Sequence, residues 1–346
     1  MNIKPYATTD WSGSLRCFGI TTALYFLTIF PLHPAIWIIF RSLVLLRIFI
    51  TVHDCSHNSL FPTQRANSWI GMILGAIVLT PMKQWRRGHN YHHQNSGNLA
   101  VVCLERAARS GDTIFFTRRE WDARGTPRRL IRIFRDPLVF FTLIPFLLFF
   151  VAYRIPGRYT RFNTLLTTLG KMAELAVITH INPNIHISHE VAACWLGAIM
   201  GVALFHLQHG VNRGYRRDPA EYSPQEAAIE GATYLTFIPW WLKWATMGIE
   251  YHHIHHLNTQ VPGYKLALAH DSQPPGTWKD VNHVGFLQAA KAMRNVMWNE
   301  ETQEYESFCA LPAIRSARHT EARPNKELCS VAPQSCGAPL CEAHRN

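Results

Sequence analysis

The sequence predicts an all-α integral membrane protein with about four transmembrane helices and a helical cap on the cytoplasmic side. The first observation is composition: 48% of the 346 residues are hydrophobic, yet the mean hydropathy is only -0.05. Apolar stretches that can enter a bilayer therefore share the chain with a large charged, water-facing portion. The second observation is spacing: most of the 19 histidines lie in four short runs, three or four residues apart, as on one face of a helix.

Apolar windows locate the membrane segments. We expect four windows to cross the bilayer, at residues 15–31, 34–52, 164–180 and 190–207. A fifth window, residues 69–82, has only about 14 residues where about 20 are needed to span the hydrocarbon core, so we expect it to be re-entrant or interfacial. A sixth, residues 137–153, is broken by Pro145 and is also expected to dip in without crossing.

The distribution of basic residues orients these segments. Arg154, Arg158 and Arg161 follow the window at 137–153, whereas the loop at 180–190 contains no lysine or arginine. Since basic loops stay in the cytoplasm, we expect the arginines inside the cell and that loop outside.

Much of the net charge of +11 lies between residues 83 and 135, where it can attract anionic lipid headgroups or an acidic electron carrier. No nucleic-acid-binding module accompanies the charge, so nucleic acid is not an expected partner.

We expect the polar residues in or beside the predicted spans to have structural roles. Lys171 and Glu174 interrupt the window at 164–180, and their spacing predicts an ion pair that faces the interior of the helix bundle. Four further residues have ligand-like spacing, but this topology places them in a polar extracytoplasmic loop, on the far side of the membrane from the other histidines. They are His180, His186, His189 and Glu190.

Four runs of histidine indicate one metal site assembled from distant parts of the chain. A lone pair of this kind is usually a surface or core histidine, but four runs together are not expected by chance. Because one zinc uses at most four ligands, about ten imidazoles indicate two metal ions, while imidazole alone leaves the metal open. Only two acidic residues, Asp54 and Glu250, lie in or beside the runs, which argues against the carboxylate-rich di-iron bundles.

The runs HDCSH, WRRGHNYHHQNSGNL, FHLQH and GIEYHHIHHLNTQVPGYKL, in this order between about Thr51 and Leu266, resemble the membrane fatty acid desaturases. The resemblance is strongest to the bacterial acyl-lipid branch that acts towards the methyl end of the chain. It implies a metal-ligand set of His53, His57, His89, His92, His93, His209, His252, His255 and His256. His206, His253, Asp54 and Glu250 are either further ligands or groups that orient a ligand through a hydrogen bond.

The resemblance also implies a reaction. Members of the family hold two iron ions, use dioxygen and two externally supplied electrons, and introduce a cis double bond into a fatty acyl chain, which is lipid-linked or a thioester. The acyl chain would enter an apolar tunnel beneath the metals, which Trp85, Trp240, Trp241 and Trp244 either line or flank as interfacial anchors. No dinucleotide fingerprint, phosphate loop or HPGG signature is present, so electrons must come from a separate protein such as ferredoxin or a b-type cytochrome. The expected location is a bacterial inner membrane, with the active site facing the cytoplasm.

Two alternatives remain open at this stage. A histidine-rich hydroxylase or ketolase would use the same iron chemistry on a lipid or a carotenoid. A metal-binding or transport membrane protein also gathers histidines, although transport sites usually lie near the bilayer midplane in broken helices.

The polar end of the chain is expected to stand apart from the enzyme. We assign residues 1–300 to the membrane domain and residues 301–346 to a flexible C-terminal tail, because apolar periodicity stops near Glu300. The eight cysteines follow no paired spacing, which predicts reduced thiols rather than disulfides. No cleavable signal peptide begins the chain, so the first span is expected to be retained.

Overall fold

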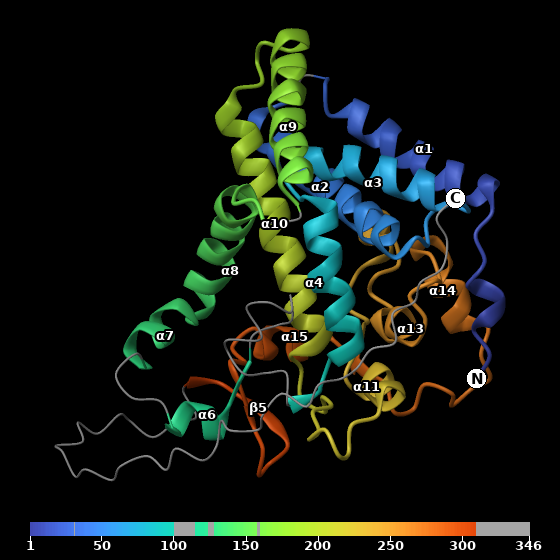
Figure 1. Cartoon of the computed structure of the whole chain (residues 1–346), viewed down its shortest axis with the longest axis vertical. Coiled ribbons are helices and arrows are strands. Elements are labelled where there is room, and N and C mark those ends of the chain that lie inside the picture. The colour runs from blue at the N-terminus through green and yellow to red at the C-terminus, as the bar shows by residue number, and fades with distance from the viewer. Residues whose placement is uncertain (31, 100–114, 124–127, 158–159, 309–346) are drawn as a thin grey trace. The chain divides into compact units, whose positions relative to one another are not determined.

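The computed structural model describes residues 1–308 except residues 31, 100–114, 124–127 and 158–159. Contacts divide the chain into two units, Met1–Ala310 and Leu311–Asn346, and everything below concerns the first. The fold is mostly helical, as predicted. The long helices gather in the upper part of Figure 1, with short helices and strands below them. The seven main helical segments are α1 (Trp11–Leu27), α2 (Pro34–His57), α3 (Gln64–Ile77), α4 (Met82–Asn95), α8 (Pro137–Phe146), α9 (Arg161–Ile181) and α10 (Ile187–His209).

Three described segments are long and apolar enough to cross a membrane: Pro34–His57, Pro137–Arg154 and Ile187–His209. The first and third coincide with predicted crossings. Of the other two predicted crossings, α1 has 17 residues, and α9 has 21 but carries Lys171 and Glu174. Helix α3 has 14 residues, about 21 Å, and is too short to span.

The break expected at Pro145 is wrong. Helix α8 continues into a π-helical turn, η3 (Leu147–Val151), and a 3-10 turn, η4 (Ala152–Arg154). Proline removes one backbone donor and crowds the preceding turn, and a locally widened helix accommodates both effects without ending. The proline therefore does not exclude this segment as a span, and which helices cross stays a prediction.

Small residues let α2 and α10 pack closely side by side. A Cβ atom on Gly197 would lie 3.2 Å from the carbonyl oxygen of Ser42, and one on Gly201 would lie 3.9 Å from Leu46 Cδ1. Ala193, one turn earlier, is fully buried. Close backbone approach through small residues four apart is a common way for membrane helices to associate. Since α2 ends at His57 and α10 at His209, this contact brings two of the histidine runs together.

A buried ion cluster joins the same helices at their other ends. Arg41 Nη2 on α2 lies 2.6 Å from Glu174 on α9 and 3.0 Å from Glu190 on α10. Lys171 Nζ lies 2.7 Å from Glu174 and 2.5 Å from Glu190. The hydroxyl of Tyr25 on α1 donates to Glu174 at 2.8 Å. The predicted Lys171–Glu174 pair is confirmed, and the two cations and two anions balance one another.

The assignment of Glu190 to a polar loop is wrong, because Glu190 lies in the first turn of α10 and is buried in this cluster. The spacing alone could not reveal that a cation on α2 faces it. The loop assignment is also wrong for His180, in the last turn of α9, and for His189, in the first turn of α10. His186 lies in the loop, with its ring 5.2 Å from that of His189.

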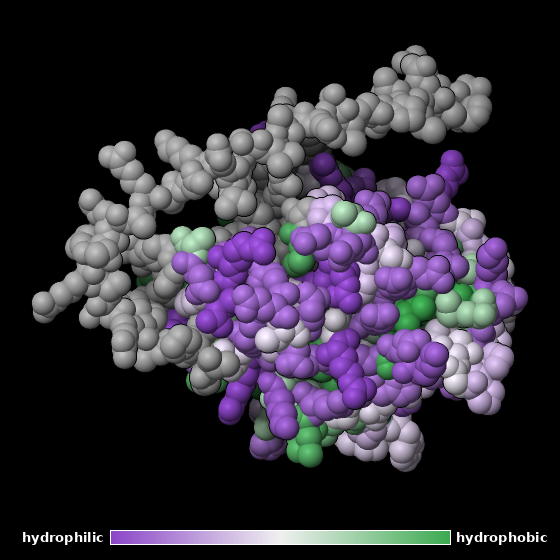
Figure 2. Space-filling model, turned by 90° about the horizontal axis from the view of Figure 1, so that it is seen from below, coloured by the Kyte–Doolittle hydropathy of each residue, from purple (hydrophilic) through white to green (hydrophobic). Residues whose placement is uncertain are grey.

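The cap contains short strands that the all-α prediction omits. Strand β1 (Phe116–Thr117) pairs parallel with β4 (Met297–Asn299), which pairs antiparallel with β5 (Glu304–Glu306). Strand β2 (Thr233–Leu235) pairs parallel with β3 (Asn282–Val284). The remaining elements are η1 (Lys4–Tyr6), α6 (Arg118–Ala123), α7 (Arg128–Phe134), α11 (Pro224–Glu230), η5 (Trp240–Leu242), α12 (Lys243–Thr246), α13 (His252–Leu257), α14 (Gly263–Asp271) and α15 (Phe286–Ala292). Figure 2 shows mainly hydrophilic residues where this end of the described unit is visible.

Strand β5 lies inside the segment that the sequence assigned to a flexible tail. Tyr305 is buried, and its hydroxyl donates to the carbonyl oxygen of His209 at 2.7 Å. Three residues are too few for a periodic pattern to show, so periodicity could not reveal that the folded unit extends past Glu300. The rest of that tail, residues 309–346, lies outside the described residues. Cys17, Cys55 and Cys194 are free and buried.

We predict that Glu190→Gln destabilises the protein by about 3 to 5 kcal/mol, because it leaves Arg41 and Lys171 to share one carboxylate in a buried site. Glu226→Gln, on the exposed surface of α11, is the control and should change stability by less than about 0.5 kcal/mol. Denaturant unfolding in detergent measures both variants. Equal stability of the two would show that the ion cluster does not hold the helices together.

Candidate metal centre

Four helices bring the histidine runs to one place. The last two turns of α2 carry His53 and His57, and the last turn of α10 carries His209. Helix α4 supplies His89, His92 and His93, and the short helix α13 supplies His252, His255 and His256. On each helix the three- and four-residue spacing aims the rings to one side. The structure thus brings together all nine histidines that the sequence analysis proposed as ligands.

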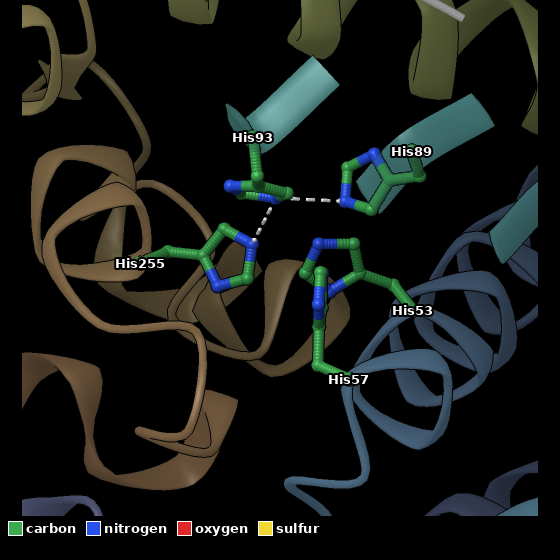
Figure 3. Close-up of side chains that lie close together, drawn as sticks. All are labelled: His53, His57, His89, His93 and His255. Carbon is green, nitrogen blue, oxygen red and sulfur yellow. Dashed lines mark hydrogen bonds between the residues drawn. The ribbon is translucent and has the colours of Figure 1, made fainter. Parts of the chain in front are cut away.

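The first group contains five histidines from three helices, with one nitrogen of each ring within 4.8 Å of the others. Figure 3 shows the five rings turned towards a common centre. His93 Nε2 lies 3.0 Å from His89 Nε2 and 3.0 Å from His255 Nε2. The members of this group are His53, His57, His89, His93 and His255.

The second group contains His92, His209, His252 and His256, again with nitrogens within 4.8 Å of one another. His209 Nε2 lies 3.0 Å from His92 Nε2 and 2.9 Å from His252 Nε2. Neighbouring residues of α4 and of α13 divide between the two groups, so the groups lie next to each other. The arrangement therefore suits two metal ions side by side.

The chemistry of the rings fits metal binding. Burial, reinforced by the neighbouring histidines, holds the pKa of His89, His93 and His255 well below the ordinary value. The same causes lower the pKa of His252 and His256. Neutral imidazole is the form that binds a metal. A ring nitrogen makes one in-plane hydrogen bond, yet His93 Nε2 faces two other nitrogens at once, an arrangement that a shared cation satisfies and protons cannot.

Several ring nitrogens in the two histidine groups have no hydrogen-bond partner among the described residues. His53 Nε2, His57 Nε2 and His256 Nε2 are buried and have no hydrogen-bond partner among the described residues. An unpaired buried polar atom is costly unless something completes it. Two of these atoms belong to the first group and one to the second, so each group has room for an ion.

Neighbouring groups orient the rings. The carboxylate of Asp54 lies 3.1 Å from His53 Nδ1 and accepts a hydrogen bond from the backbone N–H of Gly263 at 2.7 Å. The carbonyl oxygen of Gly231 lies 3.2 Å from His209 Nδ1. Such contacts fix which nitrogen faces the metal. Asp54 was among the candidates, whereas Gly231 acts through its backbone, which has no signature in sequence.

The other three candidates lie outside both groups. His206 Nε2 lies 2.9 Å from the carbonyl oxygen of Ala292, with its ring 5.2 Å from that of Phe141. His253 Nε2 lies 2.9 Å from His270 Nδ1, about a hundred degrees around α13 from His252. Glu250 accepts a hydrogen bond from the hydroxyl of Thr246 at 2.7 Å. None of these contacts reaches one of the nine grouped rings, and a role for these three residues in the centre stays a prediction.

A cavity of about 890 Å³ adjoins the metal centre. Its wall is mainly apolar and comes from α2, α8 and α10, and His53, His89 and His252 also line it. Trp85 lines the cavity and stacks on His89 at 4.2 Å between ring centroids. Trp240 and Trp241 are 84% and 58% exposed, so of the four tryptophans only Trp85 lies where the tunnel was expected. The small residues of α10 that open this space were not recognised from the sequence.

Comparisons with known proteins agree with this geometry. A family model described as fatty acid desaturase matches residues 27–278, which include both histidine groups. A fatty acid desaturase of Bacillus subtilis is 32% identical over 276 residues, or 78% of this chain and 76% of that protein. The sn-1 oleoyl-lipid 12-desaturase of Synechocystis sp. is 24% identical over 285 residues, or 77% of this chain and 76% of that protein. A shorter similarity, 34% over 67 residues, covers 19% of this chain and 18% of the sn-1 acyl-lipid omega-3 desaturase (ferredoxin) of Synechocystis sp..

We predict that His255→Ala and His256→Ala each lower the bound metal by at least about half, because each change removes a ligand from one of the two groups. His180→Ala, on an exposed position of α9, is the matched control and should keep its full metal content. Elemental analysis of the purified, monodisperse proteins provides the measurement. Full metal content in both variants would exclude these two groups as the binding sites.

Proposed function

We propose that this chain, which belongs to the fatty acid desaturase family and is therefore an oxidoreductase, introduces a cis double bond into a fatty acyl chain. The observation that carries the proposal is the gathering of nine histidines in two adjacent groups, three of which, His53, His89 and His252, line an apolar cavity. The proposed metal is iron, with two ions bound by the two groups. When bound, the iron pair supplies the oxidising power, using dioxygen and two external electrons, to remove two hydrogens from neighbouring methylene groups.

The residues of the chain contribute position and environment to this reaction. Apolar side chains such as Leu46, Phe49 and Ile144 line the cavity and favour an extended hydrocarbon chain over water. Because His53, His89 and His252 line the same space, part of a bound chain would lie against the metal centre. Burial lowers the pKa of His89 and His252, which favours the neutral form that binds a metal.

The names of the relatives and the motifs in the sequence support a proposal for the substrate and the electron donor. Relatives in Synechocystis sp. are named for acyl-lipid substrates, and we propose a lipid-linked acyl chain here. One of those names includes ferredoxin, and no flavin or nicotinamide motif is recognised in this sequence. We therefore propose a separate electron donor, either a ferredoxin or a b-type cytochrome.

Expression in a bacterial host without polyunsaturated lipids, followed by mass spectrometry of its acyl chains, tests the reaction. We expect a product that has lost two hydrogens and carries one new cis double bond, and no such product from the His255→Ala variant. A product that has gained an oxygen atom instead would favour the hydroxylase alternative. An unchanged acyl profile with an iron-loaded protein and an adequate electron donor would contradict the proposal.

We also propose an inner-membrane location with the metal centre facing the cytoplasm. The family is membrane-bound, three apolar helices are present, and the ends of α2 and α10 that carry histidines meet the polar cap. Arg154 and Arg161 flank the segment before α9, whereas the described loop between α9 and α10 contains no basic lysine or arginine side chain. Arg158, the third arginine of the predicted cytoplasmic segment, lies outside the described residues.

Single cysteines in a cysteine-free background test this orientation. We expect Asn184→Cys, exposed in the α9–α10 loop, to react with an impermeant maleimide in intact cells. Glu226→Cys, exposed on α11, should react only after the membrane is opened. Labelling of both from the same side would show that the loop and the cap share one face of the membrane.

A further inference from the structure

Arg135 is a buried cation without a carboxylate partner. It lies between α7 and α8 and is 8% exposed. Its Nη2 lies 3.5 Å from the carbonyl oxygen of Val296, at the limit for a hydrogen bond, and its Nε has no partner among the described residues. Asp136, the next residue, turns its carboxylate to the first backbone N–H groups of α8 instead. No ion pair with Arg135 occurs among the described residues.

Aromatic rings hold the guanidinium group in place. Its central carbon lies 4.3 Å from the ring centroid of Phe140 and 5.7 Å from that of Phe115. Contacts of this kind recover only part of the hydration that a buried cation loses. Burial lowers the pKa of Arg135 to about 10, so the group stays charged at neutral pH and offers hydrogen-bond donors that the described residues leave largely unused.

The cavity beside the metal centre suggests a ligand for this cation. Arg135 lines the cavity, and so does Arg87 on α4. These are the two lysine or arginine residues among the described lining residues, and that lining contains no aspartate or glutamate. A space with mainly apolar walls and charge of one sign fits a ligand with a long hydrocarbon chain and an anionic end. Arginine suits such an end because its planar fork can bind two oxygens of a carboxylate or phosphate at once.

We propose that Arg135 binds the anionic group at the head of the acyl substrate, a carboxylate or a phosphate, while the hydrocarbon chain occupies the apolar cavity. The assignment rests on the proposed function for the nature of the chain, but head-group binding can be measured without turnover. Phe140, which packs against Arg135, lines the same cavity as the grouped histidines His53 and His89. A head group held at one fixed residue limits which carbons of the chain can reach the metals.

Binding of three anionic probes with the same hexadecanoyl chain tests the proposal: the free acid, its lysophosphatidic acid and its coenzyme A thioester. Methyl hexadecanoate is the uncharged control probe. Affinities are measured on purified protein by competition with a fluorescent fatty acid. In the Arg135→Gln variant we expect affinity for at least one anionic probe to fall by about 10 to 100-fold, the usual worth of a charge-assisted hydrogen bond. Affinity for the methyl ester should not change, and Arg135→Lys should restore part of the loss.

Arg119→Gln is the matched control variant, because it removes the same charge from an exposed cap residue that does not line the cavity. Each variant is first shown to be monodisperse and metal-loaded. The probe whose affinity depends on Arg135 identifies the source of the anion. Equal affinities of wild type and Arg135→Gln for all three anionic probes would overturn the proposal. An equal loss for the methyl ester would overturn it as well, since it would indicate a packing role. Arg135-dependent binding without any desaturation would reject the proposed reaction and leave the head-group site standing.

Discussion

The structure of the cap depends on one constraint, the close approach of nitrogens from nine imidazole rings. All nine nitrogens belong to two groups in which no pair is separated by more than 4.8 Å. Protonating the rings would bring like charges together in a dry space, and leaving them neutral aims lone pairs at one another. Cations between the rings resolve both problems. Metal binding and the folding of α4 and α13 around the centre are then expected to be coupled, as in other proteins whose ligands come from several segments.

Away from the histidines, α2 and α10 are joined by buried ion pairs. Arg41 lies twelve residues before His53, about 18 Å along the helix, and pairs there with Glu190 of α10. Ion pairs thus join the two helices at one end, and at the other end the helices carry His57 and His209, one in each histidine group. Between these ends, small residues such as Gly197 and Gly201 line the cavity. The contact between α2 and α10 fixes the position of both helices at the cavity wall, which preorganises a binding site for a flexible chain.

Residue spacing predicted the features that depend on the geometry of a single helix. The common direction of the rings within each histidine run, the pairing of Lys171 with Glu174, and the position of His253 around its helix follow from 3.6 residues per turn. The choice of nine candidate ligands came from the resemblance to the desaturase family. Pairings between distant segments had no such signal. His206 shares a face with His209, yet it turns to the carbonyl oxygen of Ala292, which the sequence places 86 residues away. Tyr305 likewise joins the folded unit through strand pairing and a hydrogen bond to His209, and neither contact leaves a periodic pattern.

Neutral ligands have a consequence for everything that approaches the centre. A carboxylate-rich site offsets the charge of its ions, but imidazoles do not, so the loaded centre would keep nearly the full positive charge of two cations. Of the two acidic residues beside the runs, Asp54 contacts a ligand and Glu250 does not. Arg135 adds to the same positive field at the cavity wall. An anionic head group would therefore be attracted by the whole site as well as by one residue, while the apolar walls reject small hydrated anions that cannot fill the cavity. Charge then favours entry of the acyl substrate, and the shape of the cavity decides which part of it reaches the histidines.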